Sequence, residues 1–139
     1  MDKGLVLEKI QSLRRCLERV EGVCPKTISE LKTNFNTQDV LVLNLERAVQ
    51  LCVDIGLHIL SDSPSPMPGK MADTFRGLRE RDILSKKTAE SLAKAVGFRN
   101  LAVHEYDKLN WDIVWSIITK HLSDFKDFMG CMLKYMDRK

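Results

Sequence analysis

Apolar residues recur at helical spacing along most of the chain. A first helix is predicted over residues 2–21, where apolar positions alternate with charged ones at helical intervals, and Gly22 and Pro25 favour its end. A short helical turn is expected over 27–32. A second long helix is expected to follow Thr37, a residue type that often caps helix N-termini.

The helix predicted over residues 37–60 is apolar on more than one side. Six apolar residues repeat at steps of 4, 3, 4, 3 and 4, and further valines and leucines widen that surface. We therefore expect the central helix of a bundle, or a helix that also meets a second subunit. Its polar exceptions, spaced by 3, 4 and 4 residues, share one face: Arg47, Gln50, Asp54 and His58.

The second half of the chain continues the helical pattern after a proline-rich loop over 61–69. Helices are predicted over 71–82 and, after a Ser85 cap, from residue 86 to 96 or a little beyond. Asn110 is expected to cap a long last helix. Without any strand pattern, residues 1–139 predict a single all-α domain, an antiparallel bundle of four to five helices.

Composition narrows the class of protein. Apolar residues make up 44% and charged residues 29%, which is typical of a soluble globular domain, and no apolar run is long enough for a membrane span. Four scattered cysteines and the lack of a signal peptide predict reduced thiols and a cytoplasmic location. Residues 70–100 hold 8 basic and 4 acidic residues, and a locally basic surface there would attract a polyanion such as RNA. Charge alone favours the alternative, a solvated helix face.

Polar chemistry concentrates between Gly97 and Tyr106. Arginine can hold a phosphate bidentately and stays charged, and histidine can take or give a proton near neutral pH. Arg99 and His104 together could therefore cleave RNA without a metal, because the 2′-hydroxyl supplies the nucleophile. On a straight helix they lie roughly 140° apart, so convergence needs a bend or a symmetric partner molecule. The alternative is a surface ion pair for Arg99 and a helix-end cation for His104.

The run Gly97-Phe98-Arg99-Asn100-x-x-Val103-His104-x-Tyr106 resembles the signature of the HEPN-type toxins called HepT. The segment Asp54-Ile55-x-x-His58-Ile59 resembles the central helix of that family. The order of long helices, proline-rich loop, short helices and motif is also similar, so the resemblance covers nearly the whole chain.

The resemblance implies a HEPN-like homodimer in which two motifs form one cleft. It implies a metal-independent endoribonuclease and growth toxin, with tRNA as a plausible target, and no cofactor. It also implies an MntA-like minimal nucleotidyltransferase antitoxin that transfers AMP from ATP to the motif tyrosine. Residue by residue, Arg99 and His104 would be catalytic, Asn100 would support them, and Tyr106 would be the modified residue.

Several alternatives stay open. Asp54 and His58 are candidates for a second layer behind the cleft, or for a satisfied core pair. His121 is interpreted as a surface residue, and no metal site is expected because no ligand pair has the usual tight spacing. Trp111 and Trp115 favour core or dimer packing. Two functional rivals remain: a non-catalytic HEPN helical module that recruits a nucleotidyltransferase or nucleotide, and a helical scaffold whose motif residues point apart.

Overall fold

The computed structural model describes residues 1–64 and 66–138, which contain helices and no strand. The elements are α1 (Lys3–Val23), α2 (Ile28–Thr33), α3 (Phe35–Leu60), α4 (Met71–Glu80), α5 (Lys86–His104), a 3₁₀ turn (Tyr106–Lys108), α6 (Trp111–Ser116), a π-helical turn (Ile117–His121) and α7 (Leu122–Asp137). The predicted all-α class is confirmed. No described helix combines the length and apolar character needed to cross a membrane.

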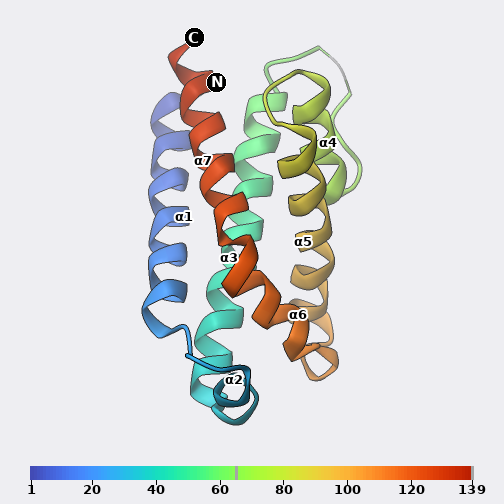
Figure 1. The fold of residues 1–139 in the computed structure, drawn as a ribbon. Helices are drawn as coiled ribbons and strands as arrows, with labels where there is room; N and C mark the ends of the chain where they lie inside the picture. The colour runs from blue at the N-terminus through green and yellow to red at the C-terminus, as the bar shows by residue number, and fades with distance from the viewer. Residues whose placement is uncertain (65, 139) are drawn as a thin grey trace.

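The long helices α1, α3, α5 and α7 run side by side and form the bundle (Figure 1). Helix α3 is central, because it packs against α1, α4, α5 and α7. The short helix α2 closes one end of the bundle, and the two chain termini lie together at the other end (Figure 1). This arrangement is the antiparallel bundle that the sequence predicts.

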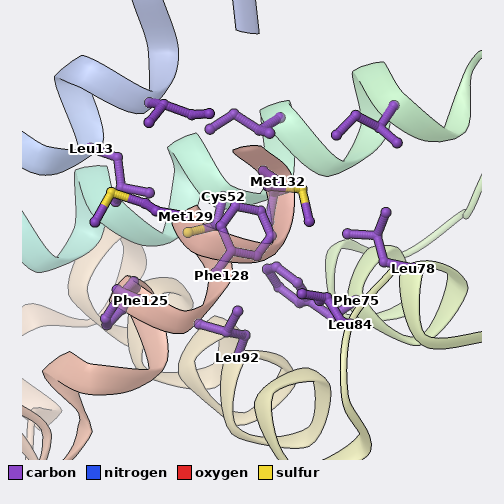
Figure 2. Close-up of a cluster of buried hydrophobic side chains, with 14 of the residues drawn as sticks. Leu13, Cys52, Phe75, Leu78, Leu84, Leu92, Phe125, Phe128, Met129 and Met132 are labelled. Carbon is purple, nitrogen blue, oxygen red and sulfur yellow. The ribbon is translucent and has the colours of Figure 1, made fainter. Parts of the chain in front are cut away.

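The main core lies between α1, α3, α4, α5 and α7 (Figure 2). The rings of Phe75 and Phe128 meet edge to face at a centroid distance of 6.1 Å. Gly56 lets α4 approach α3 closely, since a Cβ there would lie 2.6 Å from the Thr74 methyl carbon. A second buried cluster, at the α2 end of the bundle, includes Phe98 and Ala102 and so fixes the last turns of α5.

The helix starts test the predicted caps. Ser85 and Asn110 cap α5 and α6 as expected, each accepting a backbone N–H with its side chain. The expected Thr37 cap is wrong: Asn34 caps α3, and its Oδ1 accepts the Thr37 N–H at 3.0 Å. The reason is that Asn34 also ends α2, donating its backbone N–H to the Glu30 carbonyl, so α3 starts without an intervening loop.

Two helices differ in extent from the prediction. Helix α5 continues without interruption through the motif to His104, whereas the sequence placed its end near residue 96. The last helix is divided by the π-helical turn Ile117–His121, where one extra residue enters the helical turn.

Candidate active site

The last turns of α5 divide the motif between core and surface. Phe98 and Ala102, four residues apart, are buried in the second cluster. Arg99 lies half-buried beside them, and Asn100 and His104 are exposed. The apolar pair therefore anchors the helix face that leaves the motif's polar side chains outside the core.

The Arg99 guanidinium is short of partners. One of its terminal nitrogens donates a hydrogen bond to Asn100 Oδ1 at 3.2 Å, but its Nε is buried and has no acceptor. Within residues 1–64 and 66–138, no carboxylate forms an ion pair with it. The alternative interpretation of Arg99 as a surface ion pair is therefore wrong. An uncompensated guanidinium with an unused donor is suited to binding an anion.

His104 is the final residue of α5, and its ring is exposed. In the described part of the chain its side chain has no hydrogen-bond or ion-pair partner. Its place in the last turn also fits the helix-end cation of the alternative interpretation. A ring that is free of partners can exchange a proton with a bound substrate.

Tyr106 turns back onto α3 through the 3₁₀ turn. Its hydroxyl donates a hydrogen bond to Asp39 Oδ1 at 2.7 Å, and its ring meets Trp111 edge-on at 6.2 Å. Partial burial, the hydrogen bond to Asp39 and the charge of that carboxylate raise the pKa of Tyr106 well above its ordinary value. The phenol is thus protonated at neutral pH and partly exposed, held at the edge of the motif.

Asp39 is a site residue that the sequence analysis missed. It lies 67 positions before Tyr106, and only the antiparallel packing of α3 and α5 joins them. No local signal marks it, because a carboxylate in the first turns of a helix has a sufficient explanation in the helix dipole.

Asp54 and His58 lie away from Tyr106 within one protomer. They stand roughly 22 Å and 28 Å along α3 from Asp39, at 1.5 Å per residue. Asp54 accepts a hydrogen bond from Gln50 at 2.9 Å, and His58 Nε2 accepts the Asp2 backbone N–H at 3.0 Å. The structure therefore does not bring them behind the motif tyrosine, and they are satisfied separately rather than as a pair.

His121, at the end of the π-helical turn, has a different environment from His104. His121 Nδ1 lies 3.0 Å from Asp124 Oδ2, and the same oxygen accepts the Ser91 hydroxyl. Asp124 is buried, and the His121 ring is half-exposed, as a surface residue was expected to be. Trp111 and Trp115 are partly buried against the second cluster, in agreement with a packing role.

Arg99 and His104 lie on one uninterrupted helix. Five residues turn an α-helix by about 500°, so their side chains leave α5 roughly 140° apart. The bend that would let one protomer converge both groups on one phosphate is absent between them, because α5 includes both residues.

Comparisons with known proteins identify the family. The description of the matching family is "Ribonuclease HepT-like", and the match covers residues 13–132. A Shewanella oneidensis protein named mRNA nuclease HepT is 35% identical over 125 residues, which are 90% of this chain and 93% of the relative. An Aphanizomenon flos-aquae protein named tRNA nuclease HepT is 24% identical over 132 residues, covering 95% and 90%.

A solved structure gives the same result. The chain is similar to the tri-AMPylated Shewanella oneidensis HEPN toxin, solved in complex with MNT antitoxin, at a TM-score of 0.88 and 34% identity, covering 96% of this chain and 99% of that chain. The resemblance that rested on the motif is therefore confirmed, as is the ribonuclease class of its family. With 35% identity to a HepT nuclease over nearly its full length, this protein belongs to the ribonuclease HepT-like family of HEPN toxins.

Proposed function

We propose that this protein is a metal-independent endoribonuclease and the toxin of a toxin–antitoxin pair, acting on RNA in the cytoplasm. One observation carries the proposal: Arg99 is half-buried without a counter-ion, on the same helix as an unpartnered, exposed His104. The first group is suited to a phosphate and the second to a proton.

In the proposed reaction, His104 accepts the proton of the ribose 2′-hydroxyl. The 2′-oxygen attacks the adjacent phosphorus, and the bond from phosphorus to the 5′-oxygen breaks. A separate group, acting as a general acid, protonates that oxygen. The products are a 2′,3′-cyclic phosphate and a 5′-hydroxyl. Arg99 stabilises the charge on the crowded phosphorus centre, and Asn100 supports Arg99 through the 3.2 Å hydrogen bond.

The site is proposed to require two copies of the chain. Because Arg99 and His104 diverge on a straight helix, a two-fold partner would place one protomer's Arg99 opposite the other's His104. The second His104 would then supply the acid for the leaving oxygen. The apolar, exposed Val103, on the same helix as the two groups, is available for such a contact. Light scattering that gives a monomer at micromolar concentration would contradict this arrangement.

The proposed partner is an MntA-like minimal nucleotidyltransferase, with Tyr106 as the acceptor of AMP. The phenol oxygen would attack the α-phosphorus of ATP, pyrophosphate would leave, and the phenol proton would pass to Asp39, 2.7 Å away. The new phosphodiester would bring a bulky anion to the motif, where Arg99 lacks a counter-ion. RNA would then lose access to the arginine.

The decisive experiment is cleavage of RNA by the purified protein in the presence of EDTA, with tRNA and mRNA as parallel substrates. We expect cleavage to survive chelation, and tRNA to be cut. Arg99→Ala and His104→Ala should each abolish activity while the circular dichroism spectrum stays unchanged. Loss of activity on chelation would overturn the mechanism. Nucleotidyltransferase binding without any RNA cleavage would favour the non-catalytic module.

Control by modification has its own test. After incubation with the partner enzyme and ATP, the wild-type chain should gain whole AMP units in its intact mass. Tyr106→Phe should gain none, should still bind the partner, and should arrest growth despite the antitoxin. An equal mass gain in Tyr106→Phe would show that another residue accepts AMP.

A further inference from the structure

A groove of about 610 Å³ lies between α1 and α3, outside the motif. Three arginines line it: Arg15 and Arg19, one turn apart on α1, and Arg47 on α3. All three side chains are exposed, and the floor of the groove contains the buried Cys16 and Asn44. We call this feature the arginine groove.

The three guanidinium groups lie near one another around the Cys16 thiol, and no carboxylate that the structure describes neutralises them. Burial raises the pKa of the Cys16 thiol, and the charges of Arg47, Arg15 and Arg19 each oppose that rise, so all three lie near the same sulfur. Among residues 1–64 and 66–138, none of the three forms an ion pair with a carboxylate. The groove is therefore a concave surface with excess positive charge.

One carboxylate, Asp54, also lines the groove, but its charge is partly compensated. Gln50 donates to it at 2.9 Å, and the Lys9 ammonium lies 3.9 Å from its other oxygen. Three arginines against one partly compensated carboxylate leave a net positive groove. Guanidinium groups bind phosphates through paired N–H donors, so this surface suits a chain of phosphates.

The α3 residues that line the arginine groove follow Asp39 of the candidate active site along that helix. Asp39, which holds Tyr106, precedes the groove residue Leu43 by four positions, and Arg47 follows Leu43 by four more. Residues at that spacing share one helix face and rise roughly 6 Å per step. A polymer that lies in the groove is thus directed along the exposed face of α3 towards Tyr106.

We propose that the arginine groove is a binding track for the RNA substrate, in which Arg15, Arg19 and Arg47 hold backbone phosphates beyond the scissile one. This inference rests on the proposed ribonuclease activity and extends it to substrate binding. Phosphate contacts position a nucleic acid without reading its sequence. The track therefore sets affinity, while the motif carries out the cleavage.

The test measures binding of a fluorescent single-stranded RNA by anisotropy over a range of salt concentrations, in the His104→Ala background so that the RNA stays intact. Arg15→Gln and Arg47→Gln should each raise Kd and lower the slope of log K against log salt by about 1. Arg14→Gln is the matched control, because it removes the same charge from α1 one residue away and does not line the groove. It should leave Kd and slope close to those of the parent.

A second measurement separates this proposal from the proposed activity. With His104 intact, Arg47→Gln should raise KM for RNA and leave kcat unchanged, whereas His104→Ala abolishes cleavage. If the wild type cleaves RNA but groove variants bind it like the parent, the track is wrong and the ribonuclease stands. Equal losses of RNA affinity in Arg14→Gln and Arg15→Gln would show that only the net charge of the protein matters, and the track would be wrong. Retained RNA affinity with lost nucleotidyltransferase binding would assign the groove to a protein partner.

Discussion

His104 and His121 make an instructive pair. Both rings are at least half-exposed, and each residue is the last of its helical segment. His121 lies 3.0 Å from the buried Asp124, which also accepts the Ser91 hydroxyl, so each member of that cluster has a partner. His104 has none among the described residues. Polar groups that satisfy one another stabilise the fold, and groups left unpaired are available to a substrate.

The arginines show the same contrast. Within the basic segment 70–100, Arg76 forms an ion pair with Asp73 at 2.7 Å and Arg79 lies 3.9 Å from Glu90, whereas Arg99 has no carboxylate partner. The unpaired arginines of the arginine groove come from residues 1–69, where acidic residues outnumber basic ones by 9 to 8. The net charge of a sequence segment is therefore a poorer guide to an unneutralised basic surface than the ion pairs of its individual arginines.

The largest expected effect is a difference in the rate of RNA cleavage between variants of His104 and His121. His104→Ala should lower the rate of RNA cleavage by about 10²–10⁴-fold, the usual contribution of a general acid or base. His121→Ala should cleave RNA at the wild-type rate, because its ring is engaged with Asp124. Initial rates on one RNA substrate check both. Equal losses in the two variants would remove the distinction between paired and unpaired histidines.

The next effect should appear in stability rather than activity. Asp124→Ala should lower the free energy of unfolding by about 1–3 kcal/mol, since it leaves the Ser91 hydroxyl without its acceptor and empties a buried position. Asn100→Ala, on the exposed side of the motif, should change it by less than about 0.5 kcal/mol. Urea denaturation of both variants measures the difference. A stable Asp124→Ala would show that the paired cluster contributes nothing to the fold.

Helical periodicity and cap chemistry predicted most of the fold. Ser85 and Asn110 were located because each stands just before an apolar helical pattern. Thr37 failed because Asn34, three residues earlier, is an equally good cap, and the choice depends on how closely α2 approaches α3. The π-helical turn at Ile117–His121 was not predicted, since an inserted residue changes packing without an obvious sequence signal.

The candidate site was predictable only where its residues are close in sequence. The motif places four polar residues within eight positions and carries the family resemblance: Arg99, Asn100, His104 and Tyr106. Asp39 and the arginine groove depend on the packing of α3 against α5 and α1, which no local pattern encodes. The contact of His58 with the Asp2 backbone N–H likewise joins residues 56 positions apart, so the shared helix face of Arg47 and His58 did not predict it.

The smallest expected effect concerns the proton of Tyr106. Burial, the hydrogen bond to Asp39 and the carboxylate charge all favour the protonated phenol, so the pKa of Tyr106 is raised in the folded state. A raised pKa contributes stability that is fully present below the unfolded value of about 10 and is lost as pH rises through the folded value. In a Tyr135→Phe background, where Tyr106 is the one remaining tyrosine, ultraviolet absorbance should show the phenol ionising above pH 10. Asp39→Asn removes the negative charge and should return the midpoint towards about 10. An unchanged midpoint in Asp39→Asn would mean that Asp39 does not hold the proton, and that its proposed part in AMP transfer is wrong.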